Sequence, residues 1–155
     1  MSVAVYNSGG QLIDTDYTYI YLESVPPGDR TCFHIWLDPL DWAYYEFEAP
    51  TYFSDADPLP NLAIIGDHGV YDPSAGGYDI FGEVRNDHGT RVEYVSVVGT
   101  LYNASGKTVG CWWEYVSGTH LDPGQSSPFD IEFGSYNRDY VDVTSHRVHA
   151  DGLPQ

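Results

Sequence analysis

Hydrophobic and polar residues alternate with a period of two along most of the chain, and turn-forming residues separate the alternating runs. No stretch of about three helical turns keeps an apolar i, i+3, i+4, i+7 stripe free of Gly, Pro or β-branched residues. The clearest pair of runs spans residues 91–118, where an Asn-Ala-Ser-Gly turn at residues 103–106 joins two expected strands. Short strands between turn clusters are typical of a sandwich or barrel, so the pattern predicts an all-β fold.

The chain contains an internal repeat, in which residues 5–10 (VYNSGG) match residues 101–106 (LYNASG) at an offset of 96. The same offset aligns turn residues and core aromatics without a gap: Tyr19 with Tyr115, Pro27-Gly28 with Pro123-Gly124, Phe33 with Phe129, Ile35 with Ile131 and Tyr44 with Tyr140. A slightly shorter offset aligns residues 57–60 (DPLP) with residues 151–154 (DGLP). Self-similarity at a fixed offset indicates a repeated structural unit.

The two copies are unequal in length. Residues 57–155 predict a complete immunoglobulin-like antiparallel β-sandwich, whereas residues 1–56 contain counterparts of its later strands alone. The first copy lacks the equivalent of residues 62–94. We therefore expect two domains, a truncated β-sandwich repeat over residues 1–56 and a complete β-sandwich over residues 57–155.

Three segments of the complete copy carry a resemblance to a known family: residues 78–86 (YDIFGEVRN), 95–106 (VSVVGTLYNASG) and 121–129 (LDPGQSSPF). They resemble the FxLyD domain family, whose members are immunoglobulin-like sandwiches of bacterial and archaeal envelope or secreted proteins. The phenylalanine of the family signature is replaced by Gly99 in one copy and Val3 in the other, and the closing aspartate by Asn103 and Asn7. The resemblance implies an accessory or surface role and brings no catalytic residues with it.

Charged residues are sparse and one-sided, because 6 Lys and Arg residues stand against 23 Asp and Glu residues, for a net charge of −17. Such a chain lacks the basic footprint that nucleic-acid binding needs, and anionic lipid would repel it. No run approaches the ~18 apolar residues of a membrane-spanning helix. We therefore expect no nucleic-acid partner, no membrane insertion and an extracellular or cell-surface location.

Motifs for catalysis are missing from the sequence. It contains no Gly-x-Ser-x-Gly nucleophile elbow, and His34, His68, His88 and His120 have no Cys or His at metal-ligand spacing. His146 and His149 are three residues apart on an expected strand, so they point to opposite faces. The carboxylate pair of a glycoside hydrolase is defined in space, and nothing in the sequence selects one. We expect no enzyme activity, no catalytic residues and no cofactor.

Two pairs of aspartates have the i, i+2 spacing of hard oxygen ligands: Asp14 with Asp16, and Asp55 with Asp57. They are weak candidates for a calcium site. Neither pair is followed by the remainder of a calcium-binding loop, which favours the alternative of an acidic linker at the junction of the copies.

Tyr17, Tyr19 and Tyr21 alternate along one face of an expected strand, with Ile20 and Leu22 on the opposite face. If Ile20 and Leu22 lie in the core, the tyrosines form an outward row that can stack on sugar rings or bury in a subunit interface. In the alternative arrangement the aromatic face is itself the core. The sequence leaves both arrangements open.

Cys32 and Cys111 occupy non-equivalent positions of the repeat, one in each copy. A disulfide within one copy is therefore excluded, which leaves a bridge between copies, a bridge between chains, or two buried free thiols. Asn103 begins an Asn-Ala-Ser sequon at the expected hairpin turn and is a candidate glycosylation site.

These observations favour a non-enzymatic structural or adhesive protein of the cell exterior. The missing strands leave open sheet edges on the first copy, and open edges recruit strands from other chains. We expect strand complementation by a neighbouring molecule, which gives a homo-oligomer or a head-to-tail polymer, that is, a filament. The alternative is a carbohydrate-binding module that uses the tyrosine row, with a glycan as partner.

Overall fold

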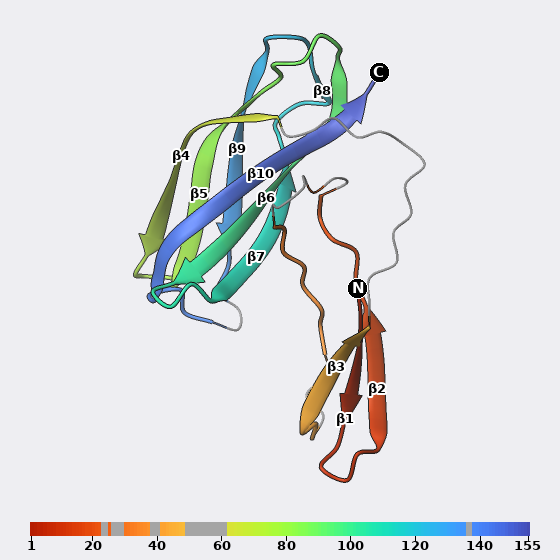
Figure 1. Cartoon of the computed structure of the whole chain (residues 1–155). Coiled ribbons are helices and arrows are strands. Elements are labelled where there is room, and N and C mark those ends of the chain that lie inside the picture. The colour runs from red at the N-terminus through yellow and green to blue at the C-terminus, as the bar shows by residue number, and fades with distance from the viewer. Residues whose placement is uncertain (23–24, 26–29, 38–40, 49–61, 136–137) are drawn as a thin grey trace. The chain divides into compact units, whose positions relative to one another are not determined.

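A computed structural model describes the chain except for residues 23–24, 26–29, 38–40, 49–61 and 136–137 (Figure 1). The described residues form ten strands in antiparallel sheets and contain no helix, so the all-β prediction is confirmed. It follows that none of the described residues belongs to a helix long and apolar enough to cross a membrane.

The strands group into two compact units, each described here by itself. Unit 1 comprises Met1–Ile20 and Phe33–Asp57, and unit 2 comprises Tyr21–Cys32 and Pro58–Gln155. This grouping differs from the expected domains, because Tyr21–Cys32 belongs to unit 2 although it lies within residues 1–56. The physical reason is packing, since Leu22 and Cys32 are buried in one cluster with Val98 of unit 2.

Unit 2 is a sandwich of two antiparallel sheets (Figure 1). Its strands are β4 (Ala63–Asp72), β5 (Gly77–Arg85), β6 (Val92–Asn103), β7 (Thr108–Tyr115), β8 (His120–Leu121), β9 (Ser126–Phe133) and β10 (Val143–Pro154). One sheet has the order β10-β6-β7, with β8 paired to the start of β6. The other sheet has the order β4-β5-β9.

The core of unit 2 lies between these sheets and is built by alternation. Every second residue of β9 is buried, among them Phe129, Ile131 and Phe133. Ile80 of β5 and Leu101 of β6 are fully buried in the same cluster. Each buried aliphatic side chain of this size contributes about 1.5–3 kcal/mol to stability.

Gly99 lies where β6 packs closely against the opposite sheet. A Cβ at this position would lie 3.1 Å from the side chains of Ile131 and Phe133. These two residues of β9 already fill the volume that a larger residue in β6 would occupy. A phenylalanine at position 99 would overpack the core, which costs about 1–3 kcal/mol or more.

Asn86 joins two loops at one end of the sandwich. The side chain is fully buried, and its Nδ2 donates to the carbonyls of Thr90 at 2.8 Å and Leu121 at 2.9 Å. Its Oδ1 accepts the N–H of His88 at 3.0 Å. Its backbone N–H donates to Gln125, also at 3.0 Å. The end of β5 is thereby fixed to the loop that precedes β9.

The opposite side of the sandwich is closed where β4 lies beside β10. The N–H of Leu62 donates to the carbonyl of Ala150 at 3.0 Å. Further along, His146 Nε2 lies 3.1 Å from Asp67 Oδ2. These contacts connect one edge of each sheet, so β4 is held against β10 at its start and near its middle.

Unit 1 contains one sheet, with the order β2-β1-β3. Its strands are β1 (Ser2–Tyr6), β2 (Leu12–Tyr17) and β3 (Tyr44–Glu48). β1 is the central strand and pairs antiparallel with both neighbours. In the described residues β2 and β3 each pair on one side alone, so both are edge strands.

The β1-β2 hairpin of unit 1 is equivalent in register to the β6-β7 hairpin of unit 2. Adding 96 to the β1-β2 pairs, which run from Ser2↔Tyr17 to Tyr6↔Leu12, gives the β6-β7 pairs, which run from Val98↔Trp113 to Tyr102↔Thr108. The irregularity in pairing also falls at the same step of both hairpins. The offset found in the sequence therefore holds for the backbone pairing.

Both hairpin turns are closed by an asparagine side chain. Asn7 Oδ1 accepts the N–H groups two and four residues ahead, each at 3.0 Å. Asn103 Oδ1 accepts the corresponding N–H groups at 3.1 and 3.0 Å. Each turn then needs a residue with positive φ, which Gly10 supplies at 77° and Gly106 at 74°. The sequence match of the two turns is thus a match of turn chemistry.

The third strand reveals one error in the sequence alignment. Tyr6 pairs with Tyr44, whereas the equivalent residue of β6 pairs with Ser145. The offset there is 101 rather than 96, so the alignment of Tyr44 with Tyr140 is wrong by five residues. The reason is that Tyr140 packs on Phe133, with 5.9 Å between ring centroids, before β10 begins.

Replacing Asn86 with alanine is expected to lower the free energy of unfolding by about 2–4 kcal/mol, because it leaves buried carbonyl groups without their donor. Urea denaturation followed by circular dichroism measures the change. The control is Asp87→Ala, which removes an exposed ion pair with Arg85 and should cost less than about 1 kcal/mol. Equal losses in the two variants would contradict the structural role assigned to Asn86.

Candidate binding surface of unit 1

No second sheet covers the sheet of unit 1 in the part of the chain that the structure describes. In unit 2 the equivalent face is covered by β9, and β9 is paired with β5. By sequence the counterpart of β9 is residues 33–37, which form no strand. Among the described residues no strand pairs with this segment, whereas β9 has β5 as its ladder partner.

Cross-strand pairing assigns the side chains of this sheet to two faces, since directly paired residues point to the same side. One face carries Val3 and Val5 of β1, Tyr45 and Phe47 of β3, and Asp14 and Asp16 of β2. We call it the inner face, because it corresponds by register to the core face of unit 2. Its two valines are buried, whereas the two rings on β3 are exposed.

Four aromatic side chains, here called the aromatic row, follow one another beside β3: Phe33, Phe47, Tyr45 and Trp42. Successive ring centroids are 5.6, 5.2 and 6.1 Å apart. Phe47, Tyr45 and Trp42 keep 49%, 51% and 43% of their surface exposed. Adjoining exposed aromatics of this size mark an interaction surface more often than a free one.

The strand beside the aromatic row is also an open edge. All five residues of β3 are exposed. On the face opposite the inner face, Glu46 and Glu48 flank the sheet together with Tyr44, whose ring stacks on Tyr6 at 4.9 Å. Desolvation, and after it the Glu46 carboxylate, raises the pKa of Tyr6 above its ordinary value. β3 thus presents aromatic rings to one side and carboxylates to the other.

Sequence reasoning alone does not single out the aromatic row. Its signal is the alternation of Tyr45 and Phe47 with Glu46 and Glu48, which is the ordinary pattern of a strand with one buried face. The structure supplies the missing fact, namely that among the described residues no strand covers the inner face beside β3.

The predicted tyrosine row is divided between the two units. Tyr17 and Tyr19 belong to unit 1, where they are 67% and 76% exposed and their rings meet edge to face at 6.1 Å. Tyr21 belongs to unit 2, where its ring lies 6.0 Å from Trp113 and burial raises its pKa. The three side chains therefore do not form one continuous outward row.

Ile20 and Leu22, on the face opposite these tyrosines, differ in burial. Leu22 is buried, but Ile20 is exposed, so the arrangement with both residues in the core holds for Leu22 and not for Ile20. The reason is that β2 ends at Tyr17, and the period of two ends with the strand.

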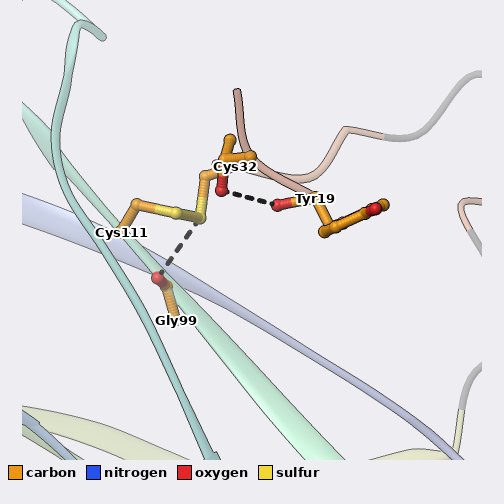
Figure 2. Close-up of a disulfide and its surroundings, with 5 residues drawn as sticks. Tyr19, Cys32, Gly99 and Cys111 are labelled. Atoms are coloured by element: carbon orange, nitrogen blue, oxygen red, sulfur yellow. Dashed lines mark hydrogen bonds between the residues drawn. A yellow bond between two sulfur atoms is a disulfide. The ribbon is translucent and has the colours of Figure 1, made fainter. Parts of the chain in front are cut away.

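Cys32 and Cys111 form a disulfide, with an S–S distance of 2.08 Å and a Cα–Cα distance of 5.7 Å (Figure 2). The bridge connects the two sequence copies, while both residues lie in unit 2. Cys32 Sγ lies 3.6 Å from the carbonyl oxygen of Gly99, which is a packing contact because a disulfide sulfur has no proton to donate (Figure 2). Tyr21–Cys32 is thereby tied to β6 and β7.

Asp14 and Asp16 are the calcium candidates that the structure describes. Asp14 Oδ1 and Asp16 Oδ1 each accept the N–H of the following residue, at 2.8 and 2.7 Å. Within the described residues, no three or more His, Cys, Asp or Glu side chains are arranged to hold a metal ion. Asp55 and Asp57 lie outside the described residues.

Asn103 and the two histidines of β10 have structural partners. The Oδ1 atom of Asn103, the sequon residue, closes the β6-β7 turn. His146 lies against Asp67, with the Tyr78 hydroxyl 3.5 Å from its Nδ1. His149 is buried on the other face of β10, as the spacing predicts.

The structure brings one pair of carboxylates together on the outward face of the β4-β5-β9 sheet. Asp79 of β5 is paired across from Glu132 of β9. Desolvation, and after it the Glu132 carboxylate, raises the pKa of Asp79 and also that of Asp130. Like charges directly opposite each other destabilise a sheet. We assign this pair no catalytic role.

Comparison with known proteins gives no match, whether to a family model, a curated protein or a solved structure. The resemblance to the FxLyD family therefore rests on residues 78–86, 95–106 and 121–129 and stays a prediction. Function has to be argued from the geometry of the site itself.

Replacing both Cys32 and Cys111 with serine is expected to lower the free energy of unfolding by about 2–4 kcal/mol. It should also weaken the near-ultraviolet dichroism that Tyr21 and Trp113 produce together, because Tyr21–Cys32 loses its covalent tie. Reduction of the unchanged chain is the matched control and should reproduce both effects. Unaltered stability and dichroism in the double variant would show that packing alone holds the segment.

Proposed function

We propose that the chain is a non-enzymatic structural or adhesive protein of the cell exterior, and that unit 1 binds by accepting strands from a neighbouring molecule. The proposal rests on a comparison of the β1-β2 and β6-β7 hairpins, which have the same register but differ in what covers them. A second sheet covers the hairpin of unit 2, and the described residues supply no such sheet to unit 1. The first copy is thus interpreted as a truncated immunoglobulin-like sandwich.

Two kinds of group on unit 1 suit an incoming strand. The edge strand β3 offers backbone N–H and C=O groups, which main-chain pairing can satisfy. The aromatic row offers apolar surface, which contributes roughly 25 cal/mol for each Å² removed from water. A strand that pairs with β3 and covers the aromatic row gains both backbone hydrogen bonds and apolar burial.

The cysteines support the location at the cell exterior. Disulfides form and persist in oxidising compartments and are rare where thiols are kept reduced. The bridge between Cys32 and Cys111 fits that setting. The excess of acids over bases and the resemblance to envelope and secreted proteins agree with it.

The donor expected from the sequence is a second copy of the chain, which gives a homo-oligomer or a head-to-tail polymer. The donated element would be the β4-β5 hairpin, which pairs with β9 in the layer that covers the equivalent face of unit 2. That hairpin is fixed at one end by Asn86 and along β10 by Leu62 and His146. Donation therefore requires unit 2 to open first.

Exposed tyrosines on unit 1 support carbohydrate binding as the second candidate. Tyr17 and Tyr19 are the most exposed pair of contacting rings in unit 1 among the described residues. Aromatic faces with a polar hydroxyl suit the mixed surface of a sugar ring. Tyr21 does not take part, because it lies in unit 2.

Strand acceptance can be tested by supplying the missing strands within the chain. Fusing a copy of residues 62–96 to Met1 places a β4-β5 hairpin ahead of β1 in the order in which it precedes β6. The fusion is expected to slow amide hydrogen exchange of residues 33–37 by about tenfold or more, because this backbone gains a ladder partner equivalent to β5. Exchange measured by mass spectrometry or NMR gives the result.

The matched control is a fusion of the same length in which the added copies of Ile80 and Val84 are serine. Its inward face is polar, so it should leave exchange of residues 33–37 unchanged. Similar protection by both fusions, or by neither, would contradict strand acceptance by unit 1.

Carbohydrate binding is tested with a glycan array and the double variant Tyr17→Ala, Tyr19→Ala. If these rings stack on sugars, the variant should lose about 1–3 kcal/mol of binding free energy, or about tenfold or more in affinity. The control is Tyr115→Ala, an exposed ring of unit 2. An unmodified chain that binds no glycan removes this candidate.

A further inference from the structure

The strand that unit 1 accepts can be specified further by charge, on the premise that the proposed function holds. The sequence of unit 1, residues 1–20 and 33–57, contains no Lys or Arg, and all 6 of these residues of the chain lie in unit 2. Unit 1 contains eight acids: Asp14, Asp16, Asp38, Asp41, Glu46, Glu48, Asp55 and Asp57. Its own side chains therefore supply no Lys or Arg charge to balance these carboxylates.

The open edge of β3 places four of its side chains in a defined order. Along the strand, Tyr45 and Phe47 point to the inner face, and Glu46 and Glu48 point to the other. A strand paired with β3 would bring its own side chains within ~4.5–5.5 Å, Cβ to Cβ, of the residues directly opposite. Residues opposite the rings should then be apolar, and residues opposite the glutamates should be basic.

The inner face adds a further acidic boundary. Asp14 and Asp16 lie on it at β2, with the buried valines of β1 between them and the rings of β3. The negative charge of these aspartates adds to that of Glu46 and Glu48 on the opposite face, so the field around the sheet attracts cations. The charge pattern thus favours a basic ligand from both sides of the sheet.

A second copy of the chain fits this surface poorly. Each chain carries a net charge of −17, so two copies repel each other. The covering hairpin of a second copy is also fixed by the side chain of Asn86 and by the β4-β10 contacts. Both observations favour a different protein as the neighbour.

We propose that β3 and the aromatic row of unit 1 bind an extended segment of a basic partner protein, in which apolar side chains alternate with Lys or Arg. The segment adds a strand to the β2-β1-β3 sheet. Its apolar side chains cover Tyr45 and Phe47, and its cations lie opposite Glu46 and Glu48. Backbone pairing provides affinity, and the alternation of apolar and basic residues provides selectivity.

The experiment uses the whole chain and two blocked peptides of equal length, one of alternating Lys and Val and the other of alternating Glu and Val. Binding is followed by calorimetry and by the fluorescence of Trp42, which adjoins Tyr45. The Lys-Val peptide should bind about tenfold or more tightly than the Glu-Val peptide, and its affinity should fall as salt is raised. Equal affinity of the two peptides overturns the proposal.

Variants separate the two contributions to binding. The double variant Glu46→Gln, Glu48→Gln should weaken the Lys-Val peptide about three- to tenfold and reduce its salt dependence. The double variant Tyr45→Ser, Phe47→Ser should weaken the peptide while keeping the salt dependence. Glu114→Gln, on the edge strand β7 of unit 2, is the matched control and should bind as the unmodified chain does. An effect of Glu114→Gln equal to that of the β3 glutamates would overturn the assignment to β3.

Light scattering of the chain alone distinguishes this inference from the proposed function. A single particle size at all concentrations is the expected result. Growth with concentration that Phe47→Ser abolishes would overturn the basic partner in favour of a second copy, and it would leave strand acceptance standing. If neither the added hairpin nor the Lys-Val peptide engages unit 1, both the inference and the proposed function fail.

Discussion

A sheet with one apolar face gains stability only when another layer removes that face from water, and this constraint orders both units of the molecule. In unit 2 the alternating residues of β9 and β5 form the opposite layer and fill the space in front of Gly99, where a Cβ would lie only 3.1 Å from side chains of β9. In unit 1 the same hairpin register leads to a different outcome. Val3 and Val5 are buried, whereas Tyr45 and Phe47 stay half exposed beside an open edge. The proposed binding surface is the part of the inner face that no second layer covers among the described residues.

The segment Tyr21–Cys32 shows that packing can override membership of a sequence repeat. Val98 lies on the face of β6 that points away from the sandwich core, and it is nevertheless buried, in one cluster with Leu22 and Cys32. The disulfide to Cys111 fixes this arrangement covalently. The position of unit 1 that corresponds to Cys111 is Thr15, so the first copy has no equivalent tie. The two copies have thus diverged in what covers each of their faces.

Much of the fold follows from the sequence, because alternation and turn chemistry are local. The Asn and Gly residues of the two turns determine the hairpin register, and the offset of 96 therefore holds for every β1-β2 pair. Beyond β9 the alignment fails, because Tyr140 packs on Phe133 in a loop whose length no local rule determines. The aromatic row could not be identified from the sequence, since Tyr45 and Phe47 look like core residues until the covering layer is found to be missing. The interpretation of Tyr17, Tyr19 and Tyr21 as one surface assumed a strand that continues through all three. β2 ends at Tyr17, so the alternation of faces does not extend to Tyr19 and Tyr21.

Amide hydrogen exchange of the unmodified chain tests the central claim most directly, because it reports which backbone groups have partners. If β3 is an open edge, alternate amides along Tyr44–Glu48 should be protected by β1 while those between them exchange nearly as fast as unpaired amides. Amides of β1, which has partners on both sides, should be protected throughout. Uniform strong protection along β3 in dilute solution, without any added ligand, would show that its outer edge is already occupied and would contradict the account.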